Sequence, residues 1–186
     1  MLAILRFTLA CSLFCSLCAA PLLGIAEEKK AQPAPVEPVK IGEIYNVHRC
    51  GPLLMAGQPT PQDLLLLSKQ GVKCLVTFRM EEEVDWDEKA AAESAGMEFK
   101  AIRYGTIDSL TPDVFAATRK ILRENQGQPL MLHCGSATRV AAVWLAYRVL
   151  DEKVDLEQAV KEAEKIGLRS KGLRAQALKY IEAESK

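Results

Sequence analysis

Short apolar runs alternate along the chain with amphipathic segments that carry helix-capping residues. The first such segment, 57–71, has Thr60 as a candidate N-cap, Pro61 in the first helical position and Gly71 at its end, which predicts a helix. The run VKCLVTF at 72–78 is apolar and rich in β-branched residues, as in strands that are buried on both faces of a sheet. A helix followed by a buried strand is therefore the first predicted unit.

The alternation continues to the end of the chain. Further helices are expected at 85–96, 111–124, 138–150, 156–167 and 173–184, further strands at 97–103 and 129–134, and a hairpin of 43–49 with 53–56. Strands that alternate with helices predict an α/β fold, a small and mostly parallel sheet flanked by helices on both faces. In such folds, sites form at the carboxyl ends of the strands.

The N-terminal segment differs from the rest. Residues 1–26 hold one positive charge and a long apolar run without an acidic residue, which predicts a secretory signal peptide. The alternative is an uncleaved membrane anchor, since 7–26 is nearly long enough to span a bilayer. Both readings predict an exported domain, periplasmic or extracellular. Residues 27–40, with three prolines among charged residues, are expected to be a disordered linker, and 41–186 the folded domain.

Composition narrows the function classes. The 186 residues include 24 Lys and Arg against 24 Asp and Glu, so there is no excess charge to favour nucleic acid, and a membrane is a partner only if the N-terminus stays uncleaved. Two histidines are too few for a histidine-rich zinc centre, so no metal or other cofactor is expected. Three cysteines follow the signal, namely Cys50, Cys74 and Cys134, and an odd number argues against a disulfide scaffold.

The motif LHCGSATR lies between the last predicted strand and the helix after it. Cys134 would face the free backbone N–H groups of the helix N-terminus, which bind anions and stabilise a thiolate. Arg139, in the first helical turn, could grip two phosphate oxygens with its fork of donors. A buried cysteine and a surface arginine are each more often structural. Together with His133, in a loop of small residues, they predict a thiolate and anion site.

Three stretches carry a family resemblance: NVHRCGPLLMAGQPTPQDLLLLSKQGVKCLVTFR, LTPDVF and LHCGSATR. They resemble the phosphatase-like domain of the β-lactamase-hydrolase-like family, which is related in fold to the dual-specificity and protein tyrosine phosphatases. The match covers most of 41–168. Four residues separate Cys134 from Arg139, which agrees with that family, whereas the related phosphatases have five. The resemblance implies a protein-tyrosine-phosphatase-like fold and a cysteine-dependent phosphatase.

Roles for individual residues follow from this resemblance. Cys134 would attack a phosphate monoester, Arg139 would hold its oxygens, and Asp108, in a loop after a strand, would protonate the leaving group. The substrate-binding residues would be His133, Gly135, Ser136, Ala137, Thr138 and Arg79, although Arg79 could instead pair with the acidic run 81–83. The substrate would be a phosphorylated small molecule or protein.

Three positions depart from the family pattern. Ala137 stands where a glycine is typical and where a positive φ is expected, Gly135 stands in place of an arginine, and Val140 replaces the Ser or Thr that assists the leaving thiolate in phosphatases. Thr138, one position earlier than the arginine, is a candidate substitute for that hydroxyl.

Two alternatives therefore remain open. One is a rhodanese-type sulfurtransferase, because rhodanese loops also have few residues after the cysteine. The other is a catalytically degenerate module that binds anions or senses oxidants, in which Cys50 or Cys74 would form a disulfide with Cys134.

Overall fold

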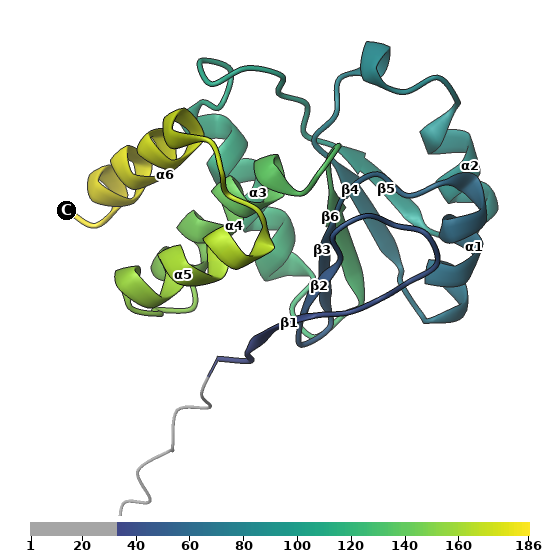
Figure 1. Cartoon of the computed structure of the whole chain (residues 1–186), viewed down its shortest axis with the longest axis horizontal. Helices are drawn as coiled ribbons and strands as arrows, with labels where there is room; N and C mark the ends of the chain where they lie inside the picture. Colours follow the sequence, from purple (N-terminus) through teal and green to yellow (C-terminus); the bar gives the residue numbers. More distant parts are fainter. Residues whose placement is uncertain (1–32) are drawn as a thin grey trace, which may run out of the picture. The chain divides into compact units, whose positions relative to one another are not determined.

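A computed structural model describes residues 33–186 as an α/β fold around one mostly parallel sheet (Figure 1). Its strands are β1 (Val36–Pro38), β2 (His48–Cys50), β3 (Leu53–Ala56), β4 (Cys74–Thr77), β5 (Glu98–Ala101) and β6 (Leu130–His133). They lie in the order β1-β2-β3-β6-β4-β5, with antiparallel pairing from β1 to β3 and parallel pairing from β3 to β5. The predicted fold class is confirmed.

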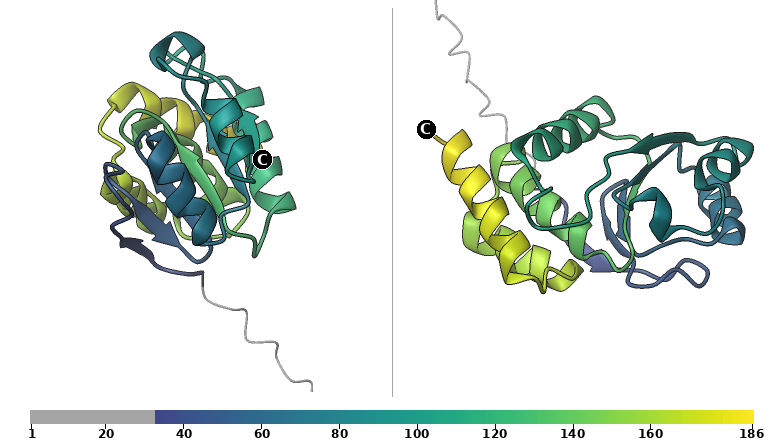
Figure 2. Two further views of the ribbon diagram at one scale, coloured as in Figure 1. Left: turned by 90° about the vertical axis from the view of Figure 1, so that its right-hand side faces the viewer. Right: turned by 90° about the horizontal axis from the view of Figure 1, so that it is seen from above.

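Helices cover both faces of the sheet. They are α1 (Pro61–Lys69), α2 (Glu88–Ser94), α3 (Pro112–Glu124), α4 (Thr138–Leu150), α5 (Leu156–Ile166) and α6 (Lys171–Glu184), with a 3₁₀ turn, η1, at Glu81–Glu83. Helices α1 and α2 lie on one face and α3 to α6 on the other (Figures 1 and 2). Strand side chains alternate between two cores, so Leu75 and Met131 pack toward α1 while Val76 and Leu132 pack toward α4.

Helix α4 is buried almost all round. Its residues from Val140 to Ala146 are at most 1% exposed. It packs against α3, α5 and α6 as well as against β3 and β6. A helix with apolar residues on every side is one that other elements surround. Because α4 follows directly on the loop after β6, this packing fixes the position of that loop.

Local capping explains why the predicted helices form. The Thr60 hydroxyl accepts from the backbone N–H of Asp63 (3.2 Å), and the Asp63 carboxylate accepts from the N–H of Thr60 (2.9 Å), which is a capping box. Gly71 ends the segment with a φ of +87°, a conformation that glycine adopts without strain. The helix predicted after Thr60 is therefore confirmed.

Two predicted elements are shorter than expected. The strand predicted at 43–49 begins only at His48, because Asn46 has a φ of +55° and interrupts the extended backbone. The helix predicted at 85–96 begins at Glu88, since the Asp87 carboxylate accepts from a backbone N–H in the first turn and so acts as the N-cap.

The predicted linker is wrong at its C-terminal end. Strand β1 lies within 27–40 and pairs with β2 in antiparallel register, and Val36 is only 5% exposed. The folded domain therefore starts before residue 41. Residues 1–26, where a signal or anchor is predicted, lie outside the described part of the chain. Among residues 33–186, no helix is long and apolar enough to cross a membrane.

Two cations from distant helices hold the segment around β1. Arg148, at the end of α4, donates to the carbonyl of Ala34 (2.7 Å), and Lys165, in α5, donates to the carbonyl of Val36 (2.6 Å). Arg148 is 2% exposed and also pairs with the buried carboxylate of Glu162 at 2.6 and 3.0 Å. These contacts explain why a short, proline-bearing segment is ordered.

Replacing Arg148 by alanine is expected to lower the free energy of unfolding by about 3–5 kcal/mol, because the Glu162 carboxylate would stay buried without its counter-charge. Urea denaturation measures this loss. The matched control is Arg174→Ala, which removes a half-exposed pair with Glu164 and is expected to cost under about 1 kcal/mol. Equal losses in the two variants would contradict the prediction.

Candidate active site

The loop that joins β6 to α4 carries Cys134. The backbone N–H of Cys134 donates to the carbonyl of Ala56 (3.2 Å), so the first residue of the loop is hydrogen-bonded to the end of β3. The Cys134 side chain is 2% exposed. It lies at the carboxyl edge of the parallel strands, where the sequence predicts the site. Helix α4 begins four residues later, at Thr138, so its N-terminal N–H groups belong to the same loop.

Ala137 has a left-handed backbone conformation. Its φ is +69°. A positive φ was expected here, because the β-lactamase-hydrolase-like family typically has a glycine at this position. An L-residue in this region costs about 1–2 kcal/mol, so the surrounding contacts must hold the loop in place. The Ala137 side chain is fully buried and packs in the core beside α4.

Side chains from outside the loop supply some of those contacts. Asn46 donates through Nδ2 to the carbonyls of Ser136 (3.2 Å) and Ile166 (2.6 Å). The Thr138 hydroxyl donates to the carbonyl of Gly167 (3.0 Å). Thr138, the candidate substitute for the hydroxyl missing at position 140, therefore binds the segment between α5 and α6.

Gly57 lies against the other side of the loop. It forms an isolated bridge with Ser136. A Cβ atom at Gly57 would lie 2.9 Å from the carbonyl oxygen of Tyr45 and 3.0 Å from that of Gly135. Both neighbours are backbone atoms, so only glycine allows this close approach. The Gly57-Gln58-Pro59 turn thus packs directly behind the candidate anion site.

Arg139 is held by the ends of two strands and by an acidic side chain. Its Nη1 donates to the carbonyls of Phe78 (3.0 Å) and Tyr104 (2.8 Å). The Glu83 carboxylate accepts from Nη1 and from Nη2, each at 2.8 Å. These contacts do not use Nε or the second hydrogen of Nη2, which are therefore the donors of Arg139 that remain available. Burial acts to lower the pKa of Arg139, but Glu83 and a Cys134 thiolate raise it overall.

Glu83 is a site residue that the sequence analysis missed as a partner of Arg139. It lies in η1 and its side chain is 33% exposed. The hydrogen bonds from Arg139 lower the pKa of this carboxyl, so it is ionised at neutral pH. A glutamate in a run of three acidic residues gives no signal of this contact.

Arg79 does not bind the loop. Its Nη1 donates to Oε1 of Gln58 (2.9 Å), and its Nη2 donates to the carbonyl of Glu83. Of the two roles considered for Arg79, the structure thus shows the contact with the acidic run. Arg79 supports the segment that carries Glu83, and through it the position of Arg139.

His133 lies behind the loop, away from solvent. It is fully buried, and its Nε2 lies 3.2 Å from Oε1 of Glu88 in α2. Burial lowers the pKa of His133 to about 4, so the ring is neutral at neutral pH. A fully buried side chain cannot touch a substrate in this conformation, so the role predicted for His133 in substrate binding is not supported.

Asp108 stands apart from the other predicted site residues. It is exposed, in the loop between β5 and α3, and forms no hydrogen bond with the described residues. The root of that loop is attached to the site, because the Tyr104 hydroxyl donates to the carbonyl of Arg139 (2.6 Å). An open depression of about 490 Å³ lies between this loop and η1, lined in part by Glu83, Tyr104 and Ser109.

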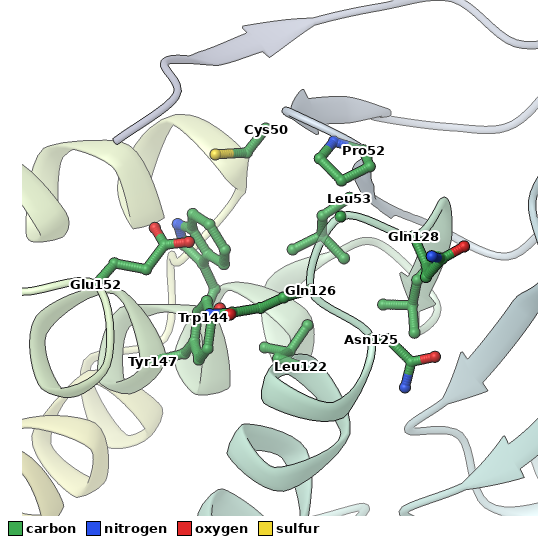
Figure 3. A pocket seen from close by; sticks show the side chains of 12 residues that line it. Cys50, Pro52, Leu53, Leu122, Asn125, Gln126, Gln128, Trp144, Tyr147 and Glu152 are labelled. Carbon is green, nitrogen blue, oxygen red and sulfur yellow. The ribbon is translucent and has the colours of Figure 1, made fainter. Parts of the chain in front are cut away.

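The other two cysteines, Cys50 and Cys74, lie at the opposite ends of the strands from Cys134. Cys74 pairs with Leu130 at the start of β6, four residues and roughly 13 Å along the strand from Cys134. Cys50 lies beside a cavity of about 80 Å³ with Trp144 and Tyr147 (Figure 3). Burial raises the pKa of both thiols to about 11. A disulfide needs Cα atoms within about 7 Å, which the register of β4 with β6 does not allow for Cys74 and Cys134 in the folded chain.

Solved structures share this fold. TpbA from P. aeruginosa, in complex with pTyr, matches with a TM-score of 0.65 and 18% identity over 84% of this chain and 99% of TpbA. PTPMT1 in complex with PI(5)P matches with a TM-score of 0.62 and 16% identity over 72% of this chain and 92% of PTPMT1. A DUF442 protein from Shewanella putrefaciens matches with a TM-score of 0.65 and 17% identity over 76% and 95% of the two chains. The fold is that of the protein-tyrosine-phosphatase-like proteins.

One curated protein resembles this chain in sequence as well. A beta-lactamase hydrolase-like protein from Agrobacterium fabrum is 31% identical over 107 residues, which are 55% of this chain and 24% of the relative. The chain therefore matches about a quarter of that relative's length. No family model matches the sequence. The predicted resemblance, and the predicted relation in fold to tyrosine phosphatases, are confirmed.

Replacing Gly57 by alanine is expected to lower the free energy of unfolding by about 1–3 kcal/mol, because the new methyl group meets two backbone oxygens. Gly135→Ala is the matched control within the loop, since a Cβ there would meet no atom within 4 Å. Its expected effect is within about 0.5 kcal/mol. Urea denaturation of both variants provides the measurement, and a tolerated Gly57→Ala would show that the loop does not need this close approach.

Proposed function

We propose that the protein is a cysteine-dependent phosphatase that hydrolyses a phosphate monoester. The observation that carries the proposal is the loop between Cys134 and Arg139, in which the thiol, the N-terminal amides of α4 and a pre-positioned guanidinium converge. Proteins of the same fold support it, since TpbA is in complex with pTyr and PTPMT1 with PI(5)P. The substrate would be a phosphorylated small molecule or protein.

The reaction has two steps. The Cys134 thiolate forms a bond to phosphorus while the bond from phosphorus to the leaving oxygen breaks, and Asp108 gives that oxygen a proton. Water then attacks the phosphocysteine, Asp108 takes a proton from the water, and the bond between sulfur and phosphorus breaks. The backbone N–H groups from Gly135 to Arg139 and the Arg139 guanidinium stabilise the charge spread over the transferred phosphoryl oxygens.

Arg139 is suited to this role because it is already oriented. Three acceptors surround Nη1, which has two hydrogens, so the guanidinium cannot rotate freely. A preorganised donor loses little entropy when the phosphate binds, and it is aligned before charge develops. Glu83 therefore supports catalysis without touching the substrate.

The fold favours this proposal over the sulfurtransferase alternative. A sulfurtransferase would use the same thiolate, but the structures that match are tyrosine-phosphatase-like, which favours phosphate transfer.

We also propose export, on the basis of the predicted signal in residues 1–26. The substrate would then be periplasmic or extracellular.

The reduced, purified protein is expected to release phosphate from p-nitrophenyl phosphate. Cys134→Ser should lower kcat at least about 10³-fold because the nucleophile is lost, and Arg139→Lys about 10²-fold because a lysine cannot make the bidentate contact. Cys74→Ser, at the far edge of the sheet, is the control and should keep wild-type activity. Sulfur transfer from thiosulfate that depends on Cys134, without phosphate release, would establish the sulfurtransferase instead.

Asp108 is tested with two leaving groups. Asp108→Asn should lower kcat about 10²–10⁴-fold for phenyl phosphate, whose phenolate leaves poorly without a proton. The loss should be much smaller for p-nitrophenyl phosphate, because its leaving group is a stable anion. Asp113→Asn, in the first turn of α3, is the control. Equal losses for both substrates would exclude Asp108 as the general acid.

A further inference from the structure

Asn46 holds the loop between β6 and α4 from outside, through the amide of its side chain. Its Nδ2 donates to the carbonyl of Ser136 (3.2 Å) and to the carbonyl of Ile166 (2.6 Å), the last residue of α5. Both partners are carbonyl oxygens, which only accept, so the amide nitrogen must face them and both of its hydrogens are used. One side chain therefore ties the loop to the end of α5.

The backbone around Asn46 fits this contact. Asn46 has a φ of +55°, in the left-handed region, where asparagine is the residue other than glycine that is most readily accommodated. Gly167 follows Ile166, and a Cβ atom there would lie 3.1 Å from Nδ2 of Asn46. A glycine at position 46 would adopt the same φ without strain, but it has no side-chain donor. Asparagine satisfies both the backbone conformation and the two carbonyls.

The contact with Ser136 also determines the direction of an N–H group. The Ser136 carbonyl and the Ala137 N–H belong to one peptide group, which is planar and trans, so they point in opposite directions. A hydrogen bond that fixes the carbonyl therefore fixes the N–H as well. Among residues 33–186, this N–H donates to no backbone carbonyl, which leaves it available to an anion.

The conformation of Ala137 favours the opposite orientation of this peptide group. Its φ of +69° is unfavourable for an L-residue. A flip of the peptide between Ser136 and Ala137 would give Ala137 a negative φ and would reverse the directions of the carbonyl and the N–H. With glycine at position 137, neither orientation would be strongly preferred, whereas alanine favours the flip. The hydrogen bond from Asn46 opposes it, because the flipped carbonyl would turn away from Nδ2.

We propose that Asn46 is a positioning residue for the anion-binding loop, which prevents this flip and so fixes the direction of the Ala137 N–H. In the proposed phosphatase, this N–H is one of the donors that hold the phosphate. Asn46 acts through the loop and does not itself touch the substrate. The effect on phosphate rests on the proposed function, whereas the effect on the peptide group does not.

The orientation of the peptide group is measured by NMR in the full, reduced chain. The nuclear Overhauser effect between the amide proton and Hα of one residue is strong at a positive φ and weak at a negative φ, because the two protons are closer at a positive φ. For Ala137 it is expected to be strong in the wild-type protein. It should be weak in Asn46→Gly, which removes the donor and leaves position 46 without strain.

A weak effect in the wild-type protein, or a strong one in Asn46→Gly, would overturn the proposal. If Asn46→Gly does not fold, Asn46→Asp takes its place, since an ionised aspartate keeps the size of the side chain and has no donor. The matched control is Asn125→Gly, which removes a hydrogen bond from Nδ2 to the carbonyl of Ile121 (2.9 Å) at the end of α3. It should leave the signal of Ala137 unchanged, and a loss there too would contradict a specific role for Asn46.

Binding of inorganic phosphate, measured by titration calorimetry, tests the consequence for the loop without turnover. Asn46→Gly is expected to raise the Kd about tenfold, because the flipped peptide no longer offers its N–H to the anion. In an Ala137→Gly background the same change should raise the Kd only about two- to threefold, since glycine does not favour the flip. Equal increases in the two backgrounds would contradict the link between Asn46 and Ala137.

The two proposals fail in different ways. A protein that shows the expected changes in Kd and at Ala137, but releases no phosphate from p-nitrophenyl phosphate, would refute the proposed function and leave the role of Asn46 intact. Phosphate release that depends on Cys134, together with an unchanged Kd in Asn46→Gly, would refute the role of Asn46 and leave the proposed function intact.

Discussion

A single guanidinium group joins the elements that meet at the carboxyl edge of the sheet. Arg139 lies in the first turn of α4, and its side chain donates to the carbonyls of Phe78, after β4, and Tyr104, after β5. Glu83 in η1 completes its contacts. Nη1 is fully used by these acceptors, so an anion can bind only through Nε and Nη2. In the proposed phosphatase, the phosphate would therefore be bound through Nε and Nη2.

Backbone packing supplies the second constraint on the loop. Four residues lie between Cys134 and Arg139, and one of them, Ala137, has a left-handed backbone conformation. Gly57 lies so close to the loop that a Cβ atom there would be 3.0 Å from the carbonyl oxygen of Gly135. Gly167 lies on the other side, where a Cβ atom would be 3.1 Å from Nδ2 of Asn46. The loop is therefore shaped from outside, and its own residues can be small. In the proposed phosphatase, small residues would leave the amide hydrogens free to face the phosphate.

Much of this arrangement could be predicted because its signals are local. Thr60, Gly71 and the apolar run of α4 identify their elements by capping and periodicity alone. Strand β1 was missed because its order depends on its pairing with β2 and on hydrogen bonds from Arg148 and Lys165, which lie more than 100 positions away, and not on its own composition. The partners of Arg139 and His133 were missed for a related reason. Glu83 lies in an acidic stretch that continues almost to α2, where nothing in the sequence separates a buried carboxylate from a solvated one.

Two glutamates near the loop, Glu83 and Glu88, lie in different surroundings. Glu88 lies beside the His133 imidazole and is almost completely buried. Glu83 faces a permanent cation and is 33% exposed, so water weakens its attraction to Arg139. The guanidinium is oriented by Glu83 through two hydrogen bonds of 2.8 Å. For the proposed phosphatase, this means that the backbone amides of the loop, which the packing around Gly57 and Ala137 holds in place, would share with Arg139 the stabilisation of a bound phosphate.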